Sequence, residues 1–408
     1  MKNCIVAQSG GPTSAINASL AGIIRGVLEH PDYDRIYGAL NGITGILEKR
    51  FLDLTDDFQK EENLDLLKVT PAMYLGSCRY KLPNVKEDIT PYEFIFKVFE
   101  SLNIGAFFYI GGNDSMDTVD KLSAYAASID SPVRIIGIPK TIDNDLCVTD
   151  HTPGFGSAAK YVASSMLEIF HDVAIYNLKS VTIVEIMGRD AGWLTASSIL
   201  ARNEYCAAPH LVYLPEAPFD TENFLTDVNQ MLQEYDNVIV AVSEGIRDKD
   251  GNYISASSDA VDHFGHSRLS GAGKALEYLL EDRMSTIRVR SIELNVLQRC
   301  SSHISSRTDL DESYQQGLHG VSLAAEGKTG LMVTLKRISN EPYKVVCDSA
   351  PVCEIANQVK SVPAEFINEQ GNDVLPGILP YLKPLIQGES GVNFSKGIPT
   401  YLPIPHLL

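Results

Sequence analysis

The chain has 408 residues, 44% of them apolar, and a formal net charge of −18. This length allows about two or three domain-sized cores, and the apolar fraction is ordinary for a globular protein. The acidic charge argues against a nucleic-acid binder, and no apolar run reaches the ~18 residues that a membrane span needs.

Cysteine usage and the start of the chain both favour a cytoplasmic protein. The seven cysteines are scattered and form no CxxC pair, as expected of reduced thiols. The segment from Met1 to Ala7 has one basic residue and an apolar stretch too short for a signal peptide.

Three predicted strands in the first part of the chain end in polar loops. The strands span residues 3–8, 106–110 and 134–138, and their loops are Ser9-Gly10-Gly11-Pro12-Thr13, Gly111-Gly112-Asn113-Asp114-Ser115 and Pro139-Lys140-Thr141-Ile142-Asp143-Asn144-Asp145. Helices are predicted at residues 14–28 and 116–129. The alternation indicates a mostly parallel sheet with a site at its carboxyl edge.

A second set of strands indicates a second α/β domain that faces the first. Its strands are predicted at residues 180–186, 237–243 and 288–297, and the last ends at Gln298-Arg299, where the chain returns toward the first domain. After residue 308 we expect a helix at 314–325, strands at 330–335 and 343–348, and a tail rich in proline and glycine. The predicted fold class is α/β, with two facing Rossmann-like three-layer domains, mostly parallel sheets and a C-terminal extension.

The loop from Pro139 to Asp145 carries more polar chemistry than a structural turn needs. Its side chains suit phosphoryl transfer. Asp143 is the candidate base for a hydroxyl proton, Lys140 can neutralise phosphate charge, and Asp145 can hold a magnesium ion, Mg²⁺. Thr141 is expected to hydrogen-bond a phosphoryl oxygen.

The two glycine loops each have a functional and a structural interpretation. Ser9-Gly10-Gly11 can bind an anion through its backbone N–H groups, or it can simply make a tight strand-to-helix turn. Asn113 and Asp114 can present oxygens to magnesium, while Asp114 or Ser115 can also cap the next helix. Neither loop matches a Walker or a GxGxxG pattern, so a dinucleotide site is not expected.

Cations and carboxylates at other loops suggest where phosphates and a sugar would bind. Arg79, with Lys81 behind it, is either a phosphate clamp or a solvated surface residue. Gly188-Arg189 and Glu244 each follow an apolar strand, and Glu244 could hold sugar hydroxyls. A basic stretch suggests a phosphate-ester site; its arginines are Arg283, Arg288, Arg290 and Arg299. No HExxH or GxSxG pattern supports a zinc enzyme or a serine hydrolase.

The content and order of these motifs resemble the 6-phosphofructokinases over roughly residues 3 to 310. The matching segments are Ser9-Gly10-Gly11, Gly76-Ser77-Cys78-Arg79, Gly111 to Ser115, Pro139 to Asp145, Met187-Gly188-Arg189, Ser243-Glu244-Gly245 and Gln298-Arg299. The resemblance implies the phosphofructokinase fold. It also implies a donor-binding domain at 1–150 with part of 299–340, a sugar-phosphate domain at 151–298, and an extension at 341–408.

Two positions bear on the phosphoryl donor. ATP-using members of this family typically have glycine where this chain has Asp114 and Lys140, whereas pyrophosphate-using members have aspartate and lysine. The Asp114 carboxylate would repel the α-phosphate of ATP, and Lys140 would supply a cation to pyrophosphate. The resemblance therefore implies reversible, magnesium-dependent phosphorylation of fructose 6-phosphate by pyrophosphate, in glycolysis or gluconeogenesis.

The resemblance also assigns roles residue by residue. Asp143 would be the base. Around pyrophosphate and magnesium it places Gly11, Arg79, Asn113 and Lys140. Around fructose 6-phosphate it places Thr141, Asp143, Met187, Gly188, Arg189, Glu244 and Arg299. Arg290 would reach the sugar phosphate of a neighbouring subunit, which implies a homodimer or homotetramer.

The chain departs from the family pattern at three positions. Asn113 replaces the usual aspartate metal ligand, so Asp114 or Asp145 would carry more of the magnesium. Val296 replaces a histidine that would bind the sugar phosphate. Ser180 replaces a second arginine shared between subunits, with Lys179 beside it as a substitute.

Two alternatives remain open at this point. One is an ATP-dependent member of the same long-chain lineage, since two positions decide the donor. The other is a non-catalytic sensor of phosphosugars, which the retention of Lys140, Asp143 and Arg189 disfavours.

Overall fold

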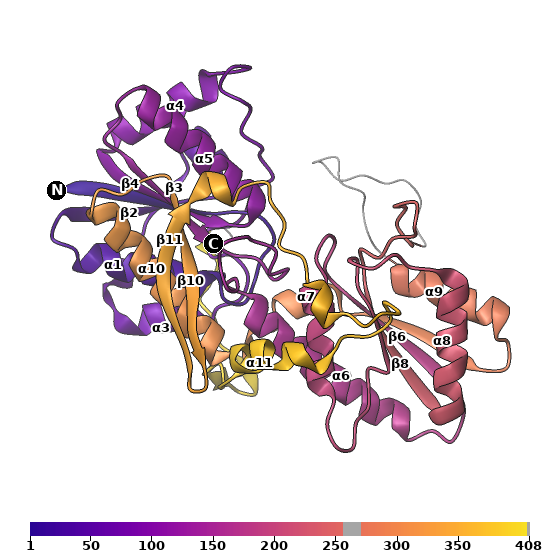
Figure 1. Ribbon diagram of the computed structural model, residues 1–408. Coiled ribbons are helices and arrows are strands. Elements are labelled where there is room, and N and C mark those ends of the chain that lie inside the picture. Colours follow the sequence, from indigo (N-terminus) through magenta and orange to yellow (C-terminus); the bar gives the residue numbers. More distant parts are fainter. Residues whose placement is uncertain (256–270, 406–408) are drawn as a thin grey trace.

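Buried apolar runs form the strands of two sheets, one in each of two lobes (Figure 1). The structure is a computed structural model that describes residues 1–255 and 271–405. Within those residues no helix is both long enough and apolar enough to cross a membrane.

The first lobe contains a seven-stranded mixed sheet in the order β11-β10-β5-β4-β1-β2-β3. The five inner strands are parallel, and both edge strands, β3 and β11, are antiparallel to their neighbours. The strands are β1 (Lys2–Gln8), β2 (Tyr33–Ala39), β3 (Phe51–Asp53), β4 (Ile104–Gly111), β5 (Arg134–Pro139), β10 (Leu331–Asn340) and β11 (Tyr343–Pro351). The central strands are buried on both sides, which explains their continuous apolar sequences.

Helices cover both faces of this sheet. One face packs against α1 (Ile16–Glu29), α3 (Glu61–Val69) and α10 (Arg307–Ala325). The other face packs against α2 (Gly42–Leu47), α4 (Thr90–Ser101) and α5 (Asn113–Ser128). The lobe is therefore three layers deep.

Helices α1 and α10 approach closely because both lack side chains at their crossing. A Cβ on Gly22 would lie 2.0 Å from the carbonyl oxygen of Tyr314, and one on Gly317 would lie 2.2 Å from that of Ser19. Only glycine fits at such a crossing, and the contact ties the C-terminal part of the chain to the first helix.

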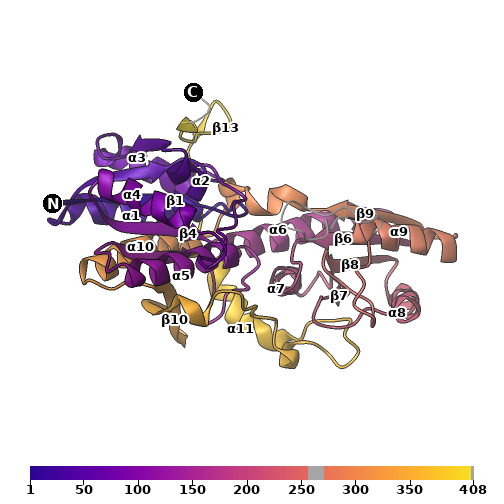
Figure 2. The same cartoon turned by 90° about the horizontal axis from the view of Figure 1, so that it is seen from above.

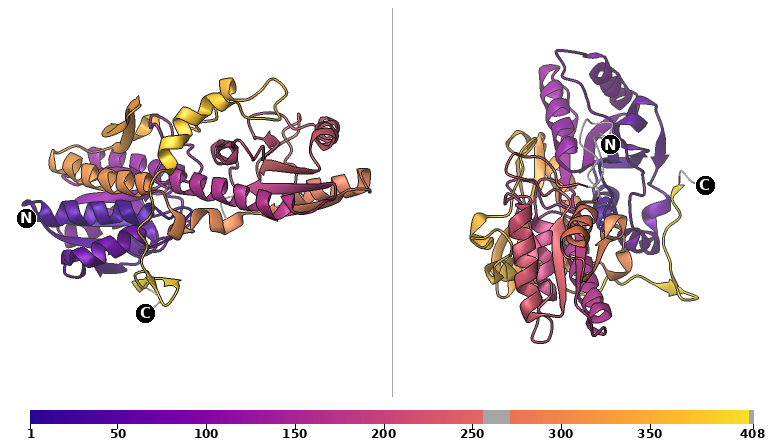
Figure 3. Two further views of the ribbon diagram at one scale, coloured as in Figure 1. Left: turned by 90° about the horizontal axis from the view of Figure 1, so that it is seen from below. Right: turned by 90° about the vertical axis from the view of Figure 1, so that its right-hand side faces the viewer.

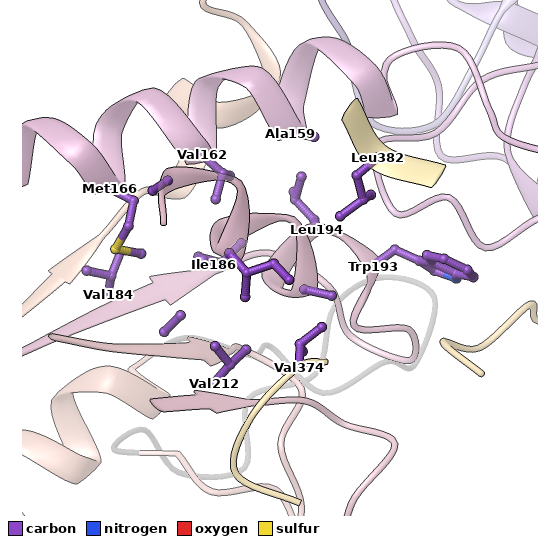
Figure 4. Close-up of a cluster of buried hydrophobic side chains, with 14 of the residues drawn as sticks. Ala159, Val162, Met166, Val184, Ile186, Trp193, Leu194, Val212, Val374 and Leu382 are labelled. Carbon is purple, nitrogen blue, oxygen red and sulfur yellow. The ribbon is translucent and has the colours of Figure 1, made fainter. Parts of the chain in front are cut away.

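The second lobe has a four-stranded parallel sheet in the order β7-β8-β6-β9. The strands are β6 (Ser180–Ile186), β7 (Leu211–Tyr213), β8 (Asn237–Ser243) and β9 (Arg288–Glu293). Helices α8 (Thr221–Glu234) and α9 (Ala272–Arg283) pack on one face. Helices α6 (Phe155–Ala174) and α7 (Trp193–Ala196) pack on the other, as Figure 4 shows for Met166 and Leu194. Figure 2 shows α6 extending from the junction of the lobes along the second sheet.

The C-terminal extension joins both lobes. Strand β11 completes the first sheet, and the chain then crosses to the second lobe, where Val374 and Leu382 enter the core beside α6 and α7 (Figure 4). Leu382 ends the short helix α11 (Leu379–Leu382). The last strands, β12 (Phe394–Ser395) and β13 (Ile398–Pro399), form a hairpin that projects from the first lobe (Figure 3).

The α/β class with two mostly parallel sheets is confirmed, while several element boundaries differ from the prediction, three of them next to the loops discussed below. Strand β9 ends at Glu293 rather than Leu297, because Asn295 has a positive φ of 44° and a 3-10 helix follows over Asn295–Arg299. Helix α10 begins at Arg307, where the Ser306 side chain accepts the Asp309 N–H. Helix α5 begins at Asn113 directly after the glycines.

Candidate active site

A cleft of about 480 Å³ lies where the carboxyl ends of strands from both lobes meet. It is lined from the first lobe by the loops that follow β1, β4 and β5, and from the second lobe by the loops that follow β6 and β8. Parallel strands bring their carboxyl ends to one edge, so loops far apart in sequence meet there. The predicted site residues that line the cleft are Gly11, Asn113, Asp114, Lys140, Thr141, Asp143, Asp145, Met187, Arg189, Glu244 and Arg299.

The glycine turn after β1 and the Lys140 side chain fit against each other. Gly10 has a φ of 81°, and a Cβ there would lie 3.1 Å from Lys140 Nζ. Lys140 Nζ donates to the Gly11 carbonyl at 2.5 Å. Burial lowers the pKa of Lys140 to about 8, because the charged ammonium form loses more solvation free energy on burial than the neutral amine form. A bound anion would favour the charged form of this lysine.

The loop after β4 places its polar residues inside the first turn of α5. The helix begins at Asn113 with Gly112 before it, so the interpretation of Asp114 or Ser115 as an N-cap is wrong. Asp114 is exposed in the cleft. The Asn113 amide is already engaged: Nδ2 donates to the Gln358 carbonyl at 2.6 Å, and Oδ1 accepts the Asn357 N–H at 2.7 Å.

The loop after β5 holds two carboxylates in a fixed shape. Asn144 takes a left-handed φ of 55°, and its buried side chain accepts the Thr152 N–H at 3.1 Å. Thr141 Oγ1 accepts the Asp143 N–H at 3.1 Å. Burial, and then the negative charges of Asp145 and Glu244, raise the pKa of Asp143. An elevated pKa suits a carboxylate that must take up a proton.

The second lobe contributes cations and a carboxylate from the ends of β6 and β8. Gly188, with a φ of 138°, donates its N–H to Glu244 Oε1 at 3.3 Å. The 3-10 helix that replaces the end of the predicted strand brings Arg299 back to the glycine turn. A Cβ on Gly11 would lie 3.3 Å from Arg299 Nη1. Among the described residues, Arg189 Nε and Arg299 Nε are buried without a hydrogen-bond partner. Such donors suit a phosphate.

Three predicted site residues do not line the cleft. Gly188 is not a lining residue, although its neighbours Met187 and Arg189 are. Arg79 is exposed on a loop whose Ser77 hydroxyl donates to the Gly10 carbonyl at 2.8 Å, so the loop borders the glycine turn. Arg290 lies on β9, where its Nη2 is 2.7 Å from Asp172 Oδ2.

The arginines of the predicted basic stretch lie apart, and Lys179, the predicted substitute for the arginine that Ser180 replaces, is bonded to its own chain. Arg283 pairs with Glu222 and Arg290 with Asp172, while Arg299 alone of the stretch lines the cleft. Lys179 Nζ donates to the Leu232 carbonyl. Within one chain the four arginines therefore do not share one site, since Arg288 and Arg290 lie on β9 and Arg299 lies in the 3-10 helix after it.

Sequence reasoning missed the contribution of the C-terminal extension to the cleft. Asn357 and Val359 line it, as does Asp190. Asp190 follows the predicted Arg189 and could have been included for that reason. No local pattern marks residues 357 to 359, since they are neither flanked by glycines nor attached to a strand end.

Comparison with known proteins agrees with this geometry. The family model described as Phosphofructokinase matches residues 3–318. A pyrophosphate--fructose 6-phosphate 1-phosphotransferase of Halomonas elongata is 39% identical over 97% of this chain and 94% of its own length. One of Methylococcus capsulatus is 39% identical over 98% and 95%. A crystal structure titled as a pyrophosphate-dependent phosphofructokinase from Marinobacter aquaeolei superimposes with a TM-score of 0.87 and 36% identity, covering 98% of this chain and 95% of that one. The chain belongs to the phosphofructokinase family.

Proposed function

We propose that this protein transfers a phosphoryl group from pyrophosphate to the 1-hydroxyl of fructose 6-phosphate. The products would be fructose 1,6-bisphosphate and phosphate, and the reaction would run in both directions. The observation that carries the proposal is that Asp114 and Lys140 both line the cleft that holds Asp143. The names of the two relatives described above support the same donor.

The transfer can be written with the residues of the cleft. The O1 atom of the sugar attacks one phosphorus of pyrophosphate, and its proton passes to the Asp143 carboxylate. A new O–P bond forms as the bridging O–P bond breaks, and phosphate leaves. Lys140 lies beside the glycine turn, where it stabilises negative charge on the transferred group and the leaving phosphate.

The sugar phosphate is assigned to the second-lobe side of the cleft. The unpartnered Nε atoms of Arg189 and Arg299 are suited to the 6-phosphate, and the Glu244 carboxylate to sugar hydroxyls. Thr141, Met187 and Gly188 would shape this side. Gly11 and Arg79 would border the pyrophosphate, since their two loops are in contact. This division supports residues 1–150, with part of 299–340, as the donor domain and 151–298 as the sugar domain.

Among the described residues that line the cleft, Asp145 offers a buried oxygen that fits a magnesium ion. Asp145 Oδ1 is buried and has no hydrogen-bond partner among the described residues. Those residues contain no group of three or more His, Cys, Asp or Glu side chains that could hold a metal, so most magnesium ligands would be pyrophosphate oxygens and water. When bound, magnesium would neutralise charge on the phosphates. The assignment of Asn113 as a ligand stays a prediction.

We also infer a homo-oligomer with shared sites. Arg290 lies outside the cleft of its own chain, which is compatible with its reaching the sugar phosphate of a neighbouring subunit. A comparison of the two KM values, for fructose 6-phosphate and for pyrophosphate, in an Arg290 variant would test this inference. Arg290→Ala should raise the KM for fructose 6-phosphate and leave that for pyrophosphate unchanged.

Initial rates with fructose 6-phosphate and magnesium, with either pyrophosphate or ATP as donor, test the proposed function. We expect activity with pyrophosphate and little with ATP. Activity with ATP alone would keep the family and overturn the donor. Activity with neither would overturn the proposal.

A further inference from the structure

Residues 357–360 cross from the first lobe to the second at the edge of the cleft. They follow Ile355, which is buried in the first core, and precede Val362, which is buried in the second. Asn357 and Val359 line the cleft. In Figure 1 this stretch is part of the loop that runs from the end of β11 toward α7.

The first end of this segment is fastened by Asn113. The side-chain amide donates to the Gln358 carbonyl at 2.6 Å and accepts the Asn357 N–H at 2.7 Å. In addition, Asn357 Nδ2 donates to Asp117 Oδ1 at 3.1 Å. Only an amide can make both Asn113 bonds, because an ionised carboxylate accepts but cannot donate. The asparagine at this position is therefore matched to the segment opposite it.

The other end is fastened by Lys360 to the loop that carries Asp143. Its backbone N–H donates to the Asp145 carbonyl at 2.8 Å. Its Nζ donates to the carbonyls of Asp150 at 2.9 Å and Thr149 at 3.2 Å, and to Asn144 Oδ1 at 3.3 Å. One side chain thus connects both ends of the loop from residue 144 to residue 150.

Lys360 also connects this loop to the second lobe. Trp193 Nε1 donates to the Lys360 carbonyl at 2.8 Å, and Lys360 Nζ lies 5.4 Å from the Trp193 ring. Two residues further on, the Val362 N–H donates to Glu216 Oε1, which also accepts the Gly192 N–H. The polypeptide that carries Arg189 into the cleft is held by the same segment.

We propose that residues 357–360 are a positioning strap for phosphoryl transfer, fastened at its ends by Asn113 and Lys360. The strap keeps the loops after β4 and β5 and the segment before α7 in one arrangement, so that Asp143 and the cations face the same reacting atoms. Asn113 and Lys360 are positioning residues. The proposal rests on the proposed function, and a displacement of about 1 Å among such groups can cost ~10²-fold in rate.

Two variants and a matched control test the strap. Asn113→Asp keeps the shape of the side chain and removes its amide N–H donor. Lys360→Met keeps the approximate length of the side chain and removes its ammonium group. Lys160→Met is the control, because Lys160 Nζ also donates to a carbonyl of the C-terminal extension, that of Gly388 at 2.7 Å, but outside the strap. The measurements are kcat, the KM values, the magnesium dependence and the fluorescence of Trp193, the one tryptophan of the chain.

We expect Asn113→Asp and Lys360→Met each to lower kcat by about ten- to a hundredfold, with the KM for fructose 6-phosphate changed by less than about twofold. The double variant should lose little more than the worse single variant, because both release the same segment. Lys360→Met should shift the Trp193 emission, since the ammonium group leaves the indole ring. The control should match the wild type in every measurement.

The variant Asn113→Asp distinguishes directly between two roles of Asn113, a positioning residue of the strap and a ligand of magnesium. If Asn113 were a ligand, aspartate would tighten magnesium binding and raise activity; that result, or an unchanged kcat in Lys360→Met, would overturn the strap. Fully additive losses would also overturn it.

If Lys360→Met does not fold, the isosteric Asn113→Asp decides. If the wild type is inactive with pyrophosphate, the proposed function fails, and an unshifted Trp193 emission in Lys360→Met would then overturn the strap independently.

Discussion

Asp143 and Lys140 bring opposite charges into the same cleft, and burial opposes both charges. Burial raises the pKa of Asp143 and lowers that of Lys140 to about 8. A carboxylate with a raised pKa is a better proton acceptor, and a buried lysine beside a glycine turn interacts strongly with an anion. The sequence placed both residues at the end of a strand, and the family resemblance added Arg299 to the same site. It did not predict the 3-10 helix after β9 that carries Arg299 there.

Replacing the proposed base should separate chemistry from binding. Asp143→Ser should lower turnover by ~10²–10⁴-fold, since the attacking hydroxyl loses its proton acceptor. Binding of fructose 6-phosphate, measured by calorimetry, should be largely retained, because Arg189, Glu244 and Arg299 remain. Asp282→Ser, at an exposed position of helix α9, is the control. Turnover near the wild-type value would remove Asp143 as the base.

Donor choice should depend on the two residues that differ from the ATP-using pattern. The double variant Asp114→Gly, Lys140→Gly should use pyrophosphate less well and admit some ATP, because a negative charge and a cation leave the donor side of the cleft. The ratio of kcat/KM values for the two donors measures this change. Full pyrophosphate activity in the double variant would contradict the account of donor choice.

At the scale of elements, the continuous apolar runs were the most informative signal. Strands β6 and β8 were predicted with the bounds that the structure shows, because both are buried along their length. The end of β9 was missed because Val296 and Leu297 look like strand residues but are exposed after the turn at Asn295. The packing of α1 on α10 could not be predicted, since glycines in separate helices give no local sign of contact.

The α1–α10 crossing predicts a sharp effect of one methyl group. Gly317→Ala would place a Cβ 2.2 Å from the Ser19 carbonyl oxygen, so the helices must separate. We expect a loss of about 1–3 kcal/mol in the free energy of unfolding, measured with urea. Gly377→Ala is the control, because its Cβ would lie 3.7 Å from Phe366, an ordinary contact. Equal free energies of unfolding for the two variants would show that helices α1 and α10 can separate without a measurable cost in stability.

His151 joins the loop after β5 to α10 through a buried ionic network. Its ring nitrogens lie 2.8 Å from Asp150 Oδ2 and 2.6 Å from Glu312 Oε2. Arg337 pairs with the same Asp150, and the Tyr343 hydroxyl donates to Glu312. Burial opposes the histidine charge, but the two carboxylates outweigh it and raise the pKa of His151 to about 9. The negative charge of the Asp309 carboxylate also interacts with the positive charge of His151.

This network predicts a pH-dependent stability. A pKa raised from 6.5 to about 9 stabilises the fold fully below pH 6.5, and the contribution is lost as the pH rises through 9. The stability difference between the wild type and His151→Asn should therefore shrink by about 3 kcal/mol between pH 6 and pH 10. Urea unfolding at both pH values measures it. A constant difference would mean that the pKa of His151 is the same in the folded and the unfolded protein.

At the scale of the whole molecule, the cleft is assembled from three parts of the chain. The first lobe contributes the loops after β1, β4 and β5, the second lobe contributes the loops after β6 and β8, and the C-terminal extension crosses between the lobes. The sequence predicted the first two, because polar loops after apolar strands mark a sheet edge. It did not predict the third, because the position of residues 357–360 depends on tertiary contacts, with Asn113 at one end and with the loop of residues 144–150 and Trp193 at the other, and not on any local pattern.

Phosphorus NMR of the wild type with pyrophosphate, fructose 6-phosphate and magnesium tests the central claim most directly. We predict that fructose 1,6-bisphosphate and phosphate appear in equal amounts, that ATP in a parallel sample remains intact, and that starting from the products regenerates pyrophosphate. Release of phosphate without the bisphosphate would show hydrolysis instead of transfer. Consumption of ATP with pyrophosphate left unchanged would contradict the proposed donor.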